Sequence, residues 1–247
     1  MTTLLSPCLL EWGRRATHEA SQAPVAQQPT PDYSSPAKTY KIYLEAIKAD
    51  DLEAARMCWV ISDNNKSGVL DVIVGTWISA HRLNKLVTSK LGIRLKRFSS
   101  VRDPLENLAR GDCTDEALER TLKRLSRAQV EVSDGTAELL IKWQKGDGYP
   151  NDAFGYSEES IRFRRVGKDW KIDANRETGL DQPSDFFTPG SWGPMFRDRL
   201  KLTNQIVAGI ESGRLGKVDD VRKEIEKQEK LLLEKYEAKK EKNRSGK

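Results

Sequence analysis

His81 and the aromatic residues near it in the sequence are the side chains best suited to a binding or catalytic site. His81 lies in a helical pattern, four residues after Trp77. An imidazole in a pocket could transfer a proton, with Tyr40, Tyr43 or Asp71 beside it. A histidine in such a helix is also typical of a boundary or surface position. We favour that second interpretation.

Aromatic side chains could line a pocket for a small apolar ligand. They also commonly fill a core, and the sequence leaves both interpretations open. The chain has none of the spacings GxxxxGK[ST], HExxH, GxSxG or CxxC, so we predict no catalytic residue, no metal site and no cofactor. The pocket candidates are Tyr40, Tyr43, Trp59, Trp77, His81, Trp143 and Phe163.

Strict alternation of apolar and polar residues predicts a β-hairpin at about 159–174. Ile161, Phe163, Trp170 and Ile172 fall on one face, and Gly167 supplies the turn. We expect these side chains to face a core. The same alternation extends the expected inward face to Val130, Val132, Leu139, Ile141 and Trp143.

Carboxylates on the strands would be acid–base candidates if they pointed into that core. Glu131, Glu138 and Asp173 fall on the opposite phase, so we expect them to meet solvent. All the inward positions that we assign are apolar. This favours a filled core or an apolar pocket over a reaction centre.

Helical patterns precede the strands. Apolar residues recur every three or four positions after Pro36, from about position 64 to Gly92, and after a cap at Thr114. Two strands then flank the turn Asp134-Gly135, and the later hairpin completes four antiparallel strands. This order predicts an α+β fold, in which N-terminal helices pack on an antiparallel β-meander and a helical extension follows.

Two segments resemble a known superfamily. The run YKIYLEAIKADDLEAA at 40–55 looks like its first helix, a break and the "DxxAA" start of the next helix. The run GKDWKID at 167–173 is similar to its "GxWKI" closing hairpin. On these residues, about 36–175 resembles the nuclear transport factor 2-like superfamily, which includes ketosteroid isomerase and the SnoaL-like cyclases. The resemblance implies a curved sheet and helices around a cone-shaped pocket.

That superfamily contains enzymes, ligand binders and interaction modules, so the resemblance implies a fold more than a function. For an enzyme like ketosteroid isomerase it implies an inward Asp or Glu on a strand, with a Tyr donor nearby. Homodimers through the outer face of the sheet are also common. Here that face would carry Arg162, Arg164, Lys171, Glu131 and Glu138, which could pair across a two-fold axis or meet water.

Composition divides the chain into four parts. Residues 1–35 are rich in proline and poor in core formers, which predicts a disordered leader or linker. We assign 36–180 to the α+β domain, 181–216 to an irregular arm and a helix, and 217–247 to a charged C-terminal helix or tail. The last helix has a narrow apolar seam, which packs on its own domain, meets solvent or pairs with a partner helix. We favour packing on its own domain or plain solvation over pairing with a partner.

The charge and hydropathy of the chain limit the kinds of partner that it can bind. The net charge of +5 arises from 42 basic and 37 acidic residues that are interspersed, which makes nucleic-acid binding unlikely even with a basic cluster at Arg94, Lys96 and Arg97. No stretch reaches the roughly 20 apolar residues that cross a bilayer. The N-terminus has a weak likeness to a signal peptide. We therefore expect a soluble protein, either cytoplasmic or exported.

These observations favour a non-catalytic module that binds a small apolar ligand or a protein partner, with a homodimer as one form. The first alternative is a lyase or isomerase that uses the cone pocket. The second alternative is weak nucleic-acid binding through basic patches.

Overall fold

The protein has an α+β fold built on a five-stranded sheet with the order β1-β5-β4-β3-β2. The computed structural model describes residues 30–61, 67–95, 103–109, 113–142, 158–177 and 193–245. The strands are β1 (Trp59–Val60), β2 (Gln129–Ser133), β3 (Thr136–Lys142), β4 (Glu158–Val166) and β5 (Asp169–Asp173). Strands β2 to β5 pair antiparallel, which confirms the predicted meander. The short β1 pairs parallel with β5 and was not predicted.

Tight turns fix the register of the meander. Asp134 and Gly135 both have positive φ, 42° and 76°, as a two-residue hairpin between twisted strands requires. This turn places Val130 opposite Leu139. Gly167, with φ 62°, turns β4 into β5, and Lys168 after it does not have a positive φ. Both turns lie where the sequence predicts them.

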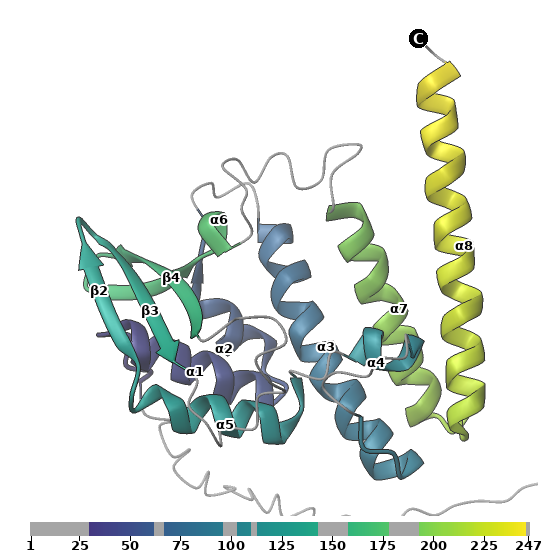
Figure 1. Ribbon diagram of the computed structural model, residues 1–247, viewed down its shortest axis with the longest axis horizontal. Coiled ribbons are helices and arrows are strands. Elements are labelled where there is room, and N and C mark those ends of the chain that lie inside the picture. Colours follow the sequence, from purple (N-terminus) through teal and green to yellow (C-terminus); the bar gives the residue numbers. More distant parts are fainter. Residues whose placement is uncertain are drawn as a thin grey trace, which may run out of the picture. The chain divides into compact units, whose positions relative to one another are not determined.

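One face of the sheet carries the core. Helices α1 (Pro36–Lys48) and α5 (Asp115–Leu125) pack on this face against β3, and α1 also contacts β5. Figure 1 shows both helices beside the sheet. The buried strand residues are Ala137, Leu139, Ile141, Ile161, Phe163, Trp170 and Ile172.

Two residues expected on this inward face are exposed. Val130 and Val132 are 40% and 63% exposed, because they lie on the outermost strand. The helices that cover β3 do not cover β2 to a comparable extent. Alternation alone therefore assigned the face of β2 correctly but not its burial.

Asp173 also differs from the expectation, because it is fully buried rather than solvated. One of its oxygens accepts hydrogen bonds from Arg164 Nε and Nη2, at 3.0 and 2.7 Å. The other accepts from the backbone N–H of Asn175 at 3.1 Å. Pairing with Val60 of β1 covers this end of β5. A buried carboxylate needs such partners, and here it has them.

Helix α3 (Ser67–Leu91) lies between two hydrophobic cores. Val74 and Ile78 belong to the core at the sheet, whereas Leu83 and Val87 belong to a second core with α4 (Pro104–Ala109), α7 (Gly193–Glu211) and α8 (Val218–Ser245). Helix α7 approaches closely at Gly75, where an added Cβ would lie 3.1 Å from a methyl group of α7. The sequence predicts one apolar stripe on this helix, whereas α3 buries side chains in two cores.

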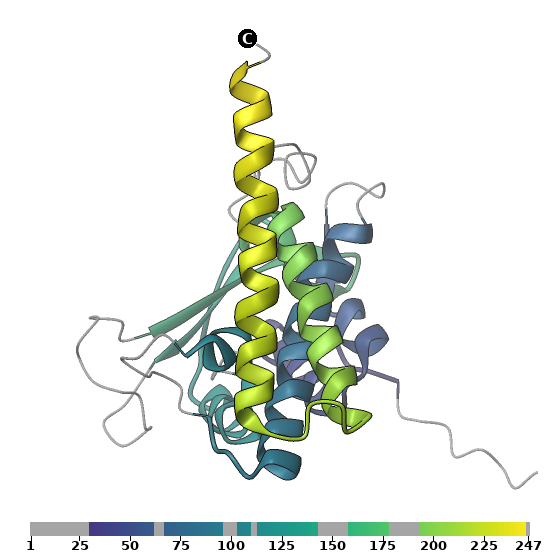
Figure 2. The same cartoon turned by 90° about the vertical axis from the view of Figure 1, so that its right-hand side faces the viewer.

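Helix α8 packs through its first half on the rest of the chain. Val221 and Ile225 are fully buried in the second core. The Arg222 guanidinium binds Asp103, just before α4, at 2.7 Å. Figure 2 shows α8 running alongside α7. The apolar seam of α8 is thus covered by its own chain, which is one of the two outcomes that we favoured.

Contacts with the sheet begin before Pro36. Tyr33, which we had assigned to the leader, is 7% exposed, and its carbonyl accepts from the Trp170 N–H at 2.9 Å. The next residues lead into α1, whose N-cap is Ser35. Three features of the sequence lie outside the described residues: the signal-like segment, Lys96 and Arg97 of the basic cluster, and the pocket candidate Trp143. Two short helices complete the fold, α2 (Leu52–Met57) and α6 (Ala174–Glu177).

Replacing Ile225 by alanine should destabilise the protein by about 2–5 kcal/mol, because the side chain is fully buried and its removal leaves a cavity. Urea denaturation measures this change in the free energy of unfolding. The matched control is Leu233→Ala on the same helix, where the side chain is 60% exposed and the expected change is below ~0.5 kcal/mol. Equal effects of the two changes would contradict the docking of α8.

Candidate functional site

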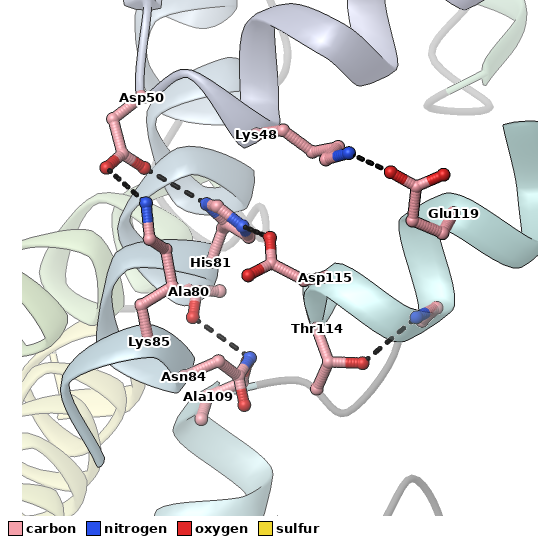
Figure 3. Close-up of polar contacts among 11 residues, drawn as sticks. Lys48, Asp50, Ala80, His81, Asn84, Lys85, Ala109, Thr114, Asp115 and Glu119 are labelled. Carbon is pink, nitrogen blue, oxygen red and sulfur yellow. Dashed lines mark hydrogen bonds and ion pairs between the residues drawn. The ribbon is translucent and has the colours of Figure 1, made fainter. Parts of the chain in front are cut away.

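His81 of α3 is held between two aspartates. Its Nδ1 lies 3.0 Å from Asp50 Oδ1, and its Nε2 lies 2.8 Å from Asp115 Oδ1. The imidazole is 0% exposed, which corrects the expected boundary or surface position. Figure 3 shows one carboxylate at each edge of the ring. We call His81, Asp50 and Asp115 the histidine clamp.

Both aspartates lie at the ends of secondary-structure elements. Asp50 follows α1 and has φ 56°, a left-handed conformation that Asp tolerates better than most residues. Asp51 then caps α2 through its side chain. Asp115 is the first residue of α5, where Thr114 Oγ1 accepts from the Ala117 N–H at 3.2 Å. The clamp therefore joins the α1–α2 connection, the middle of α3 and the start of α5.

The geometry of the clamp decides what chemistry His81 can do. An ionised carboxylate only accepts hydrogen bonds, so both contacts form when both ring nitrogens carry protons. In that state neither nitrogen has a lone pair for a substrate proton. A general base needs such a lone pair within hydrogen-bond reach of the substrate. The arrangement therefore suits a structural joint between elements.

Further polar contacts surround the clamp. Lys85 Nζ lies 3.7 Å from the second oxygen of Asp50. Asn84 donates to the carbonyl of Ala80 in α3 and to the carbonyl of Ala109 at the end of α4. Lys48 at the end of α1 pairs with a glutamate of α5. These contacts, drawn in Figure 3, fix α1, α3, α4 and α5 around one point.

A pocket of about 480 Å³ lies beside the clamp, between the C-terminal half of α3 and the N-terminal half of α5. Its lining includes Asp115 of the clamp and Leu95, which is 7% exposed. The other lining residues are polar or charged, and the aliphatic parts of their side chains add to the apolar surface of the pocket. Its charged side chains are Lys85, Arg94, Arg120, Asp115 and Glu116.

The charges in this pocket are unequally paired. Asp115 faces His81, and Glu116 binds Arg94 at 2.9 Å. Lys85 has only the long contact with Asp50 among its described ion pairs. The Nε of Arg120 is buried and has no hydrogen-bond partner in the described part of the chain. The N-terminus of α5 adds a partial positive charge. The pocket therefore favours a small anion.

The structure places most of the aromatic pocket candidates elsewhere, in the core at the sheet. The rings of Tyr40 and Tyr43 stack with centroids 6.0 Å apart, and Tyr43 meets Trp59 edge-on at 5.5 Å. Phe163 is fully buried in the same core, and Trp77 packs against it. These residues lie together, but His81 is not among them. They fill space between the helices and the sheet.

One inward titratable pair was missed. Tyr40 Oη donates to Glu159 Oε1 at 3.0 Å. Burial, and then the charge of Glu159, raises the pKa of Tyr40 well above its ordinary value. Glu159 lies on the same face of β4 as Ile161 and Phe163. Extending the alternating pattern of β4 by two residues toward its start would therefore have predicted an inward Glu159.

Several basic residues that could contact nucleic acid have internal partners in the described part of the chain. Arg94 pairs with a glutamate of α5, and Arg164 binds the buried Asp173. The Arg165 guanidinium lies over the ring of Trp170, 5.9 Å from its centroid. These pairings leave the basic residues less available to phosphates, and nucleic-acid binding stays an untested alternative.

Comparisons with protein-family models, with curated proteins and with solved structures give no match for this chain. The superfamily resemblance therefore stays a prediction. No described helix is both long enough and apolar enough to span a membrane. The described residues also contain no group of three or more His, Cys, Asp or Glu side chains placed to hold a metal ion.

Replacing His81 by phenylalanine should destabilise the protein by about 1–3 kcal/mol, because both aspartates lose their donor while remaining partly exposed. Chemical denaturation measures the change. Lys85→Gln is the control on the same helix, with an expected change within ~0.5 kcal/mol. A double-mutant cycle of His81→Phe and Asp50→Asn should show coupling, and additive effects would contradict the clamp.

Proposed function

We propose that this chain is a non-catalytic binding module of the nuclear transport factor 2-like kind, and that its ligand site is the pocket between α3 and α5. The observation that carries the proposal is the pocket of about 480 Å³ lined by Lys85, whose contact with Asp50 is 3.7 Å long, and by Arg120, whose buried Nε has no hydrogen-bond partner among the described residues. The ligand would be a small anion, a carboxylate or a phosphate. The apolar ligand expected from the aromatic residues is less well supported, because the described aromatics pack into a core.

The two cations suit this role because they come from different helices. Lys85 lies on α3 and Arg120 lies on α5, and both line the pocket. An oxyanion between them would receive charge-assisted hydrogen bonds, which are about twice as strong as neutral ones. His81 and Arg94 offset the carboxylates Asp115 and Glu116, so these repel the anion less. Within the clamp, His81 thus reduces the repulsion that Asp115 exerts on an anion in the pocket.

The size and lining of the pocket limit the kind of anion that it can hold. Ligand pockets commonly measure ~300–1,000 Å³, so this one suits a metabolite-sized molecule. Leu95 supplies an apolar part of the lining, and Thr88 and Ser89 supply hydroxyl groups. An anion with a short apolar portion fits this combination.

The double variant Lys85→Gln with Arg120→Gln should lose anion binding. Citrate and inorganic phosphate are the probes, and binding to the wild type should raise its melting temperature by ~2–4 °C for each kcal/mol of linkage. The matched control, Lys41→Gln with Lys123→Gln, removes the same charge from the groove between α1 and α5. Native mass spectrometry of the purified wild type should show a bound anion. A clean apo mass with no thermal shift, or equal loss in both variants, would contradict the proposal.

A second candidate is isomerase or lyase chemistry at Tyr40 and Glu159. It is favoured by their hydrogen bond of 3.0 Å, because the resemblance to ketosteroid isomerase implies an inward strand carboxylate with a Tyr donor nearby. A carboxylate base and a phenol donor could together move a proton next to a carbonyl group.

Proton exchange separates the two candidates. The experiment measures by NMR how fast the α-protons of a steroid ketone exchange in heavy water. With a non-catalytic module, we expect the exchange rate to equal the rate in buffer alone. Exchange above that rate, lowered ~100-fold or more by Glu159→Gln but unchanged by Glu45→Gln at an exposed position, would establish the second candidate.

A further inference from the structure

Strand β2 is exposed along its whole length. It is the outermost strand of the sheet, and all five of its residues are exposed. Its apolar residues Val130 and Val132 are 40% and 63% exposed. On the other side of β2, no described strand pairs with it. Such an edge is a template for a further strand unless proline, a bulge or a covering element protects it.

The turn into β3 decides which backbone groups point outward. A two-residue turn closes with a hydrogen-bonded pair between Ser133 and Thr136, and such pairs alternate along antiparallel strands. Gln129, Glu131 and Ser133 therefore bond to β3. Val130 and Val132 direct their N–H and C=O groups to the open edge. The two exposed valines thus present both unpaired backbone groups and apolar side chains.

We propose that β2 pairs antiparallel with β2 of a second copy of this chain, with Val130 opposite the partner's Val130. The interface is the edge of the sheet, not the outer face considered from the sequence. Strand addition at an open edge gains main-chain hydrogen bonds from both chains. It also continues the inner face of one sheet into the other.

A second copy suits this edge because the sequence of the strand is complementary to itself in one register. A two-fold axis perpendicular to the sheet joins the inner face of one copy to the inner face of the other. The axis must then pass through a pair of identical residues, which can be residue 130, 131 or 132. An axis at 131 sets Glu131 against its own copy, and like charges directly opposite are destabilising. An axis at 132 brings in the turn residue Asp134 and shortens the ladder. An axis at 130 places Gln129 opposite the partner's Glu131, twice by symmetry.

The same register is favourable on the inner face. It sets Ala128 opposite the partner's Val132, with the two Val130 side chains at the centre. Ala128 already packs against the core at the sheet, so the apolar strip would continue from one subunit into the other. The contact is short, which places it with weak and transient interfaces of under ~1,200 Å².

The full chain should show a reversible monomer–dimer equilibrium by sedimentation equilibrium up to ~1 mM. Val130→Glu should raise the dissociation constant at least tenfold, because it sets like charges opposite each other. Val166→Glu is the matched control at a valine that is 46% exposed on β4, away from this edge, and should leave association unchanged. Circular dichroism checks that both variants fold. A wild type that stays monomeric, or a dimer that both variants weaken equally, overturns the proposal.

Disulfide formation tests the register independently. Residues opposite each other in a hydrogen-bonded pair have Cα atoms ~5.5 Å apart, within the range for a disulfide. In a Cys8→Ser background, Val130→Cys should form a linked dimer faster than Val132→Cys on mild oxidation. The native Cys58 and Cys113 are buried and should not compete. Faster linking at 132 overturns the register with Val130 at the axis.

Discussion

The buried imidazole of His81 is the constraint on which the arrangement of the helices depends. A polar ring with 0% exposure needs partners for its two nitrogens, and these are Asp50 and Asp115. Each aspartate can reach the ring because it lies at the end of an element, one after α1 and one at the start of α5. Two segments distant in sequence, the α1–α2 connection and the start of α5, are thereby brought to one point of α3.

The pocket between α3 and α5 follows from that arrangement. Its two walls are α3 and α5, and the clamp joins these helices at the edge of the pocket. The second core, with α7 and α8, covers the other side of α3, so α3 is supported from both sides. A site on such supported helices can stay preorganised, which lowers the cost of binding. The open edge of β2 lies in a different part of the fold and offers the main-chain groups that a binding surface needs.

Local patterns in the sequence predict much of this fold. Gly167 and Asp134-Gly135 mark the turns, Thr114 caps α5, and alternation assigns Ile161, Phe163 and Ile172 to the core. The same rules fail where burial depends on distant contacts. Val132 is exposed because the helices that cover β3 do not cover β2 to a comparable extent. His81 is buried because two remote carboxylates meet it. Those pairings carry no local signal, so the clamp and its pocket could not be read from the sequence.

The most direct test of this account is the protonation of the His81 ring in the folded protein, measured by ¹⁵N NMR of labelled histidine. The clamp predicts that both ring nitrogens carry a proton, because each faces a carboxylate oxygen within 3.0 Å. Such a ring is a joint and has no lone pair for acid–base chemistry. A neutral ring with one bare nitrogen would contradict the structural role of the clamp.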